Sequence, residues 1–235
     1  MSKLKIIWIC HFTNKEVQSK LPLWKRSNEL SPWIPNLIKG FHGRDDIELH
    51  VILPHDYLIR QTYSAKENIY YYFIPYGMPI YHRHWPEIFP YDVYTDFAAF
   101  RSKVKILVAK INPDLINLIG AENSYYSASI LDFINKYPVL ITIQGFISQM
   151  KDVINLTPIV HKRIEIEEKI LREFKIYCGE QDSSQYISSY KQNHQFYRFY
   201  FPVNEDLVYK THEKQKCDLI FYGRIVKEKG VIDFI

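Results

Sequence analysis

Short runs of apolar residues recur along the chain, and segments with helical spacing separate them. Most of these runs are continuous rather than alternating, which is typical of strands that are buried on both faces of a parallel sheet. We therefore predict strands at 4–10, 47–53, 69–74, 115–119, 139–143, 175–178, 196–201 and 219–222.

The segments between these runs have features of helices. Ser31 is suited to an N-cap, Pro32 is suited to the first helical position, and the apolar residues that follow return at helical spacing. Further helices are predicted at 92–111, 123–135, 158–174 and 182–190. Strands that alternate with helices form βαβ crossovers. The expected fold class is α/β, a Rossmann-like, doubly wound, mostly parallel sheet in the order 3-2-1-4-5-6 with a seventh strand at one edge.

The carboxyl-terminal residues read as the start of a second domain. The polar segment 206–216 reads as an interdomain connection, and 217–235 predicts one strand, a loop with two cations and the beginning of a helix. We therefore expect 1–205 to form an amino-terminal domain. We expect 217–235 to be the first strand and loop of a truncated carboxyl-terminal domain.

Charge and hydropathy exclude several classes of protein. The net charge of +4 is spread over 235 residues, without the clustered cations of a nucleic-acid-binding protein. No apolar run reaches the roughly 18 residues of a membrane span, and the first residues do not read as a signal peptide. We expect a cytoplasmic location, and the slight excess of cations is compatible with peripheral contact at the inner face of a membrane.

No residue pattern predicts a metal or a cofactor. The three cysteines lie far apart, which favours buried thiols over a disulfide or a zinc site. His82 and His84 have no third ligand near them in the sequence, and the turn after the first strand lacks the G-x-G-x-x-G pattern of dinucleotide-binding domains. We expect neither a bound metal nor NAD.

Residues at the carboxyl ends of strands are the first candidates for a site, because open parallel sheets bind ligands there. Gly120, Glu122 and Asn123 follow the fourth strand, and Gln144 and Gly145 follow the fifth. The Glu122 carboxylate could orient an acceptor hydroxyl or could simply cap the next helix. Gln144 offers both a donor and an acceptor, and Gly145 would let the backbone approach a ligand closely.

The charged helix predicted at 158–174 contains one further pair of candidates. Arg163 and Glu167 lie four residues apart on it. This spacing is typical of an ordinary ion pair on a helix surface.

The end of the chain has the pattern of an anion site. Gly223 and Arg224 follow the strand at 219–222, and Lys229 and Gly230 precede an apolar stretch that starts like a helix. The amino end of a helix offers free N–H groups, and the two cations add charge. This G-R-x-x-x-E-K-G pattern resembles the opening of the nucleotide-sugar domain in GT-B glycosyltransferases of the family 4-like type.

Three earlier landmarks resemble the same family and occur in the expected order. They are the strand entry at 112–116 with its Gly-x-Glu exit, the Gln144-Gly145 turn, and the strand end at Gly179. Where many members carry a catalytic-site His, this sequence has Ile119.

The resemblance implies a retaining glycosyltransferase that moves a sugar from a nucleotide-diphosphate sugar to a saccharide or lipid-linked acceptor, as in polysaccharide biosynthesis, with no cofactor. It implies that Gly223, Arg224 and Lys229 bind the donor diphosphate. Arg224 and Lys229 would stabilise the leaving group, and Glu122 would complete the catalytic residues. The acceptor-binding residues would be Thr13, Asn14, Gly120, Glu122, Asn123, Gln144 and Gly145.

Two other functions remain open. The chain could be a non-catalytic module that binds a saccharide or another acceptor, or an epimerase or phosphorylase on the same two-domain plan. The second acidic segment of the family's donor domain falls beyond residue 235. We therefore expect negligible transferase activity from residues 1–235 alone.

Overall fold

The computed structural model describes residues 3–12, 18–19, 21, 23, 33–55, 57–58, 60–78, 85–86, 88–152, 154–200 and 202. All of them belong to one compact unit, Met1–Val203. The strand predicted at 219–222, the connection at 206–216 and the residues Gly223, Arg224 and Lys229 lie outside the described residues. The predicted boundary between two domains therefore stays a prediction.

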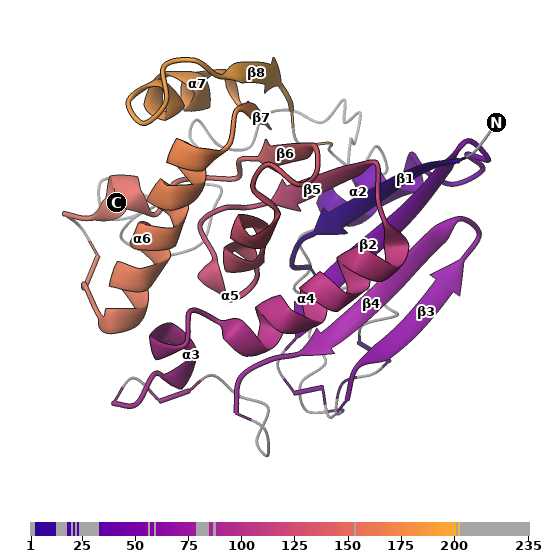
Figure 1. The fold of residues 1–235 in the computed structure, drawn as a ribbon, viewed down its shortest axis with the longest axis horizontal. Helices are drawn as coiled ribbons and strands as arrows, with labels where there is room; N and C mark the ends of the chain where they lie inside the picture. Colours follow the sequence, from indigo (N-terminus) through magenta and orange to yellow (C-terminus); the bar gives the residue numbers. More distant parts are fainter. Residues whose placement is uncertain are drawn as a thin grey trace, which may run out of the picture. The chain divides into compact units, whose positions relative to one another are not determined.

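The described residues form an eight-stranded sheet in the order β3-β4-β2-β1-β5-β6-β7-β8 (Figure 1). The strands are β1 (Leu4–Ile9), β2 (Ile47–His55), β3 (Thr62–Lys66), β4 (Ile69–Pro75), β5 (Leu115–Ile119), β6 (Val139–Thr142), β7 (Ile176–Gly179) and β8 (Gln195–Arg198). All neighbouring strands are parallel except β3 and β4. The predicted α/β fold, its doubly wound order and the seventh strand at one edge are confirmed.

The helical segments are α2 (Trp33–Lys39), α3 (Tyr91–Tyr94), α4 (Ala98–Ile111), α5 (Ser124–Ser127), α6 (Pro158–Glu173) and α7 (Gln181–Ser188), with the 3-10 segments η2 (Ala128–Phe133) and η3 (Ser148–Met150). Two of the helices predicted from sequence differ in detail. The segment predicted at 92–111 is broken into α3 and α4, because Asp96 and Phe97 have left-handed backbone conformations. The segment predicted at 123–135 begins as α5 and tightens into η2.

Each face of the sheet has its own hydrophobic core. Successive side chains of a strand point to opposite faces, so Ile7 and Ile9 of β1 belong to one core while Ile6 and Trp8 belong to the other. Helices α4, α5 and α6 pack on the first face, which Figure 1 shows beneath them, and α2 packs on the second.

The chain order of the sheet reverses between β1 and β5. Strand β1 pairs with β2 on one side and with β5 on the other, and the helices that follow β1 and precede β5 cover opposite faces. Such a reversal leaves a crevice at the carboxyl ends of the two strands, where doubly wound folds bind their ligands. Among the described residues, no helix is long and apolar enough to cross a membrane.

Candidate functional site

The chain leaves β5 through a glycine turn that folds Glu122 back toward the sheet. Gly120 has a φ of +89°, and its N–H donates to the carbonyl of Thr142 at 2.8 Å. A Cβ at Gly120 would lie 2.5 Å from Tyr126 Oη and 3.0 Å from Glu122 Oε1. Only glycine combines this backbone conformation with so close an approach. Gly120 is therefore the residue that lets the Glu122 carboxyl group lie at the end of β5.

The Glu122 carboxyl group is buried without a full set of partners. Its Oε2 atom is inaccessible and has no hydrogen-bond partner among the described residues. Burial raises the pKa of Glu122 to about 7, and the nearby charge of Glu167 acts in the same direction. The cap of α5 is a different residue, because the Oδ1 atom of Asn123 accepts a hydrogen bond from the N–H of Tyr125 at 3.3 Å. Glu122 is thus available for something other than capping.

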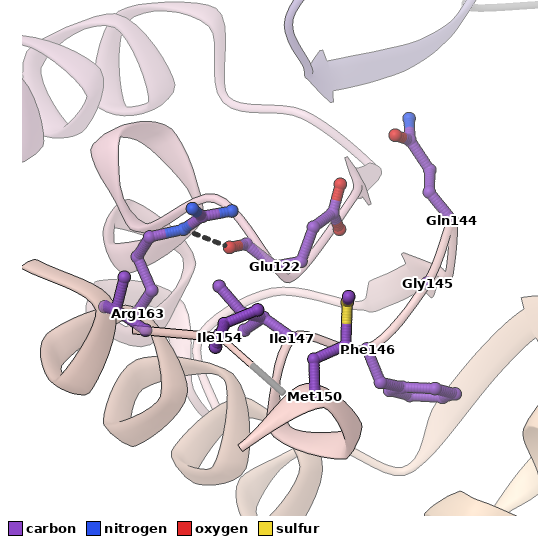
Figure 2. A pocket seen from close by; sticks show the side chains of 9 residues that line it. Glu122, Gln144, Gly145, Phe146, Ile147, Met150, Ile154 and Arg163 are labelled. Atoms are coloured by element: carbon purple, nitrogen blue, oxygen red, sulfur yellow. Dashed lines mark hydrogen bonds between the residues drawn. The ribbon is translucent and has the colours of Figure 1, made fainter. Parts of the chain in front are cut away.

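Arg163 holds the backbone of Glu122 rather than its carboxylate. The Arg163 Nε atom donates to the Glu122 carbonyl oxygen at 3.0 Å. Figure 2 shows this bond and shows the Glu122 carboxylate pointing away from Arg163. The guanidinium therefore fixes the turn after β5 and lowers the Glu122 pKa only as a minor influence beside burial.

A cavity of about 460 Å³ opens beside Glu122. Its lining residues come from the carboxyl ends of β5 and β6, from η3 and from α6, and they are Glu122, Gln144, Gly145, Phe146, Ile147, Met150, Ile154, Val160 and Arg163 (Figure 2). A Cβ placed on Gly145 would meet nothing within 4 Å. The backbone at Gly145 is therefore open to a ligand in this cavity.

Glu167 proves to be a buried anchor, and the surface ion pair expected for Arg163 and Glu167 is wrong. The Glu167 side chain is fully buried, and its carboxylate accepts hydrogen bonds from the N–H groups of Ile147 and Ser148, both at 2.9 Å, and from the Ser148 hydroxyl. These bonds tie the start of η3 to α6. Burial raises the pKa of Glu167, while the bonds from Ser148 and Ile147 act in the opposite direction.

A buried polar row lies under the site. Thr142 donates to Asn117 Oδ1 at 2.8 Å and contacts Cys178 Sγ at 3.1 Å, so these side chains connect β5, β6 and β7. Sequence reasoning did not single out Asn117, although a polar residue inside an apolar strand run was a signal for it. Cys10 and Cys178 are free and buried, as expected of these two cysteines.

The structure brings together five of the residues predicted for the site. Gly120, Glu122 and Asn123 follow β5, Gln144 and Gly145 follow β6, and β5 pairs directly with β6. Of these five, Glu122, Gln144 and Gly145 line the cavity, while Gly120 and Asn123 shape the turn beside it. Thr13, Asn14, Gly223, Arg224 and Lys229 lie outside the described residues. Their roles stay predictions.

The described residues contain no group of three or more His, Cys, Asp or Glu side chains that could hold a metal ion. His82 and His84 lie outside this part of the chain. The groups that the cavity offers to a ligand are therefore a carboxyl group, an amide, a guanidinium and an open glycine backbone. This set suits the recognition of hydroxyl groups.

No protein-family model matches the chain, and no curated protein matches its sequence. Its fold is similar to that of sucrose-phosphate synthase from Thermosynechococcus elongatus, with a TM-score of 0.53 and 11% identity over 83% of this chain and 47% of that chain. A second structure of that enzyme gives a TM-score of 0.51 and 10% identity, covering 86% of this chain and 90% of the other. The chain thus spans about half the length of the first of these structures. At such low identity the similarity concerns the fold alone, and it shows that the described residues have a glycosyltransferase-like Rossmann fold.

Proposed function

We propose that this chain takes part in glycosyl transfer and that the cavity beside Glu122 binds the acceptor. The observation that carries the proposal is that Glu122, whose buried Oε2 atom has no hydrogen-bond partner among the described residues, lines a ligand-sized cavity. The position of the cavity beyond the carboxyl ends of β5 and β6 supports it, since open parallel sheets bind ligands at that edge. The similarity of the fold to that of sucrose-phosphate synthase supports glycosyl transfer as the general kind of reaction.

The chemistry of Glu122 fits an acceptor hydroxyl. A carboxyl group with a pKa of about 7 is present in both protonation states near neutral pH, so it can take a proton from a reacting hydroxyl and pass it on. The Gln144 amide can donate to one sugar oxygen and accept from another hydroxyl. Together, Glu122 and Gln144 would hold a saccharide ring through the hydroxyl groups on one side of the ring.

The donor side of the proposal rests on the pattern at the end of the chain. Gly223, Arg224 and Lys229 would bind the diphosphate of a nucleotide sugar, in a retaining transfer of the family 4-like type. Arg224 and Lys229 would offset the charge that develops on the leaving diphosphate. Two cations beside the expected helix start would supply this stabilisation without a metal ion. A saccharide or lipid-linked molecule would be the acceptor.

Saturation-transfer NMR with methyl glycosides of common hexoses tests the acceptor site. We expect the chain to bind at least one of them, and we expect Glu122→Gln to weaken that binding by at least about 10-fold, because a hydrogen bond to a charged group is lost. Glu165→Gln is the matched control, since Glu165 is an exposed residue of α6 with 64% of its side chain accessible. A chain that binds no glycoside, or one whose binding is unaffected by Glu122→Gln, would contradict the proposal.

A chain in which the second domain is restored separates transfer from binding alone. Addition of nucleotide-diphosphate sugars to that chain should give ligand signals that Arg224→Ala and Lys229→Ala weaken. If the restored chain binds a glycoside but no nucleotide sugar, the non-catalytic binding module is favoured over the transferase.

A further inference from the structure

The lining of the cavity beside Glu122 is partly polar and partly apolar. Its polar groups belong to Glu122, Gln144 and Arg163. The rest of its lining is apolar and consists of Phe146, Ile147, Met150, Ile154 and Val160. Figure 2 shows Ile154, Ile147 and Met150 side by side beneath the Glu122 carboxylate, and Arg163 and Gln144 at opposite flanks. These five apolar residues are called the apolar wall below.

The apolar wall is held in place by the surrounding structure. Glu167 fixes Ile147 and Ser148 through the backbone bonds at 2.9 Å. The Phe146 ring packs against Tyr186 with ring centroids 4.5 Å apart. The Tyr186 hydroxyl also donates to Ser148 Oγ at 2.8 Å, which adds a second tie between α7 and η3. These contacts fix Phe146 and Ile147, the part of the wall that precedes η3.

Most of the wall remains partly accessible. Phe146, Met150, Ile154 and Val160 are half-buried, and only Ile147 is buried. Apolar side chains that face a cavity gain free energy when a ligand removes their remaining surface from water. A ligand that consists only of a polar ring would not gain this free energy, because its hydroxyl groups need hydrogen-bond partners and the apolar wall has none to offer.

We infer that the acceptor is amphipathic, with a hydroxyl-bearing ring at Glu122 and Gln144 and an apolar aglycone against Met150, Ile154 and Val160. This inference rests on the proposed function and names the class of acceptor. The cavity volume of about 460 Å³ lies within the usual range for small-molecule sites, so it accommodates a ring together with part of a chain. Met150 suits such a partner, since its unbranched side chain adapts to ligands of different shape.

Calorimetric titration with hexyl and methyl glycosides of the same sugars tests this inference. Each methylene that leaves water contributes a factor of about 4 in affinity, so five partly buried methylenes should make the hexyl glycoside at least about 10-fold tighter. Phenyl glycosides form a third arm, which distinguishes an aromatic aglycone from an alkyl chain. All titrations stay below the concentration at which the hexyl glycosides aggregate.

Variants of the apolar wall locate the effect. Met150→Ser and Ile154→Ser should each bring the hexyl-to-methyl affinity ratio close to one. Ile106→Ser is the matched control, because Ile106 of α4 is 68% exposed and lies outside the wall, and it should keep the ratio of the parent chain. Thermal unfolding of each variant confirms that it is folded, and the two wall variants serve as independent tests.

The outcomes separate this inference from the proposed function. One outcome is equal affinity for hexyl and methyl glycosides, with both weakened by Glu122→Gln. It would contradict the inference of an amphipathic acceptor but not the proposed acceptor site. This result is expected if another segment or a second copy of the chain covers the apolar wall. A hexyl preference that survives both wall variants would also contradict that inference. Absence of any glycoside binding would instead contradict the proposed function itself.

Discussion

At the scale of single residues, Glu122 owes its properties to burial. Its Oε2 atom has lost water without gaining a hydrogen-bond partner among the described residues, so the neutral form is favoured and the pKa rises from an ordinary 4.5 to about 7. Asn123, the neighbouring residue, caps α5 in its place. A buried carboxyl group that serves neither a cap nor an ion pair is costly to maintain, which is a common property of functional sites.

The raised pKa of Glu122 predicts a pH-dependent stability. Because the folded-state pKa lies above the unfolded value, the protonated carboxyl favours the folded state; this contribution is full below about pH 4.5 and is lost as the pH rises through about 7. The whole change is on the order of 3 kcal/mol. Urea unfolding of the parent chain and of Glu122→Gln between pH 4.5 and 8 measures it. The free energy of unfolding of the parent chain minus that of Glu122→Gln should rise as the pH falls from 8 to 4.5, because only the parent chain loses stability when Glu122 ionises. A value that does not vary with pH would show that the pKa of Glu122 is not raised.

Gly120 is predicted to be irreplaceable for two reasons at once. Gly120→Ala forces a side chain into a left-handed backbone and brings its Cβ to 2.5 Å from Tyr126 Oη. We expect a loss of about 2–5 kcal/mol in the free energy of unfolding. Gly43→Ala is the control, since Gly43 has a φ of +72° but nothing within 4 Å of an added Cβ, and it should lose only about 1–2 kcal/mol. Equal losses in chemical denaturation would contradict the crowding at Gly120.

The roles of some single residues could be predicted from the sequence, and the roles of others could not. Glu122 could be found because it follows a continuous apolar run, where a strand must end. Glu167 was misread because a charged residue four positions after Arg163 is usually an exposed partner. Its position on the same stripe as Ile164, Ile170 and Leu171 was the sign of burial. The N–H groups from which its carboxylate accepts belong to the start of η3, nineteen and twenty residues earlier. Local spacing contains no information on such a contact.

At the scale of elements, η3 and α6 act as one unit that supports the cavity. Glu167→Gln keeps the shape of the side chain but leaves it poorly matched to three donors, so we expect a loss of about 1–3 kcal/mol in the free energy of unfolding. Glu165→Gln on the same helix should change stability by less than about 0.5 kcal/mol, because Glu165 makes an exposed ion pair. Urea unfolding compares the two, and similar small losses would argue against the anchor.

Strands with continuous apolar runs were predictable, and the edge strand β3 was not. The run at 115–119 predicts β5 with its observed ends. Strand β3 was missed because Thr62, Tyr63, Ser64, Ala65 and Lys66 form no apolar run, as befits an exposed edge strand with one neighbour. The break between α3 and α4 was missed because Phe97 enters the core from a left-handed backbone, which no helical spacing indicates.

At the scale of the whole molecule, the order of the sheet decides where chemistry can occur. The alternation of strands and helices was enough to predict the doubly wound order. In that order β5 and β6 are parallel neighbours, so the residues that follow their carboxyl ends lie side by side. The cavity itself was not predictable. Its apolar wall comes from η3, from the segments on either side of it and from α6, and Glu167 fixes the start of η3 against α6. The fold could thus be predicted from the sequence, and so could the residues after β5 and β6 that line the cavity. The apolar wall could not be predicted.

The central claim is that a saccharide binds in the cavity beside Glu122, and methyl NMR of methionine tests it most directly. The chain has 3 methionines, and Met150 lines the cavity while Met78 does not. Selective ¹³C labelling of their methyl groups therefore gives a simple spectrum, in which Met150→Leu assigns the reporter. Titration with the tightest glycoside should move the Met150 signal, leave the Met78 signal in place, and have little effect in Glu122→Gln. Saturable binding that leaves the Met150 signal unmoved would contradict the account.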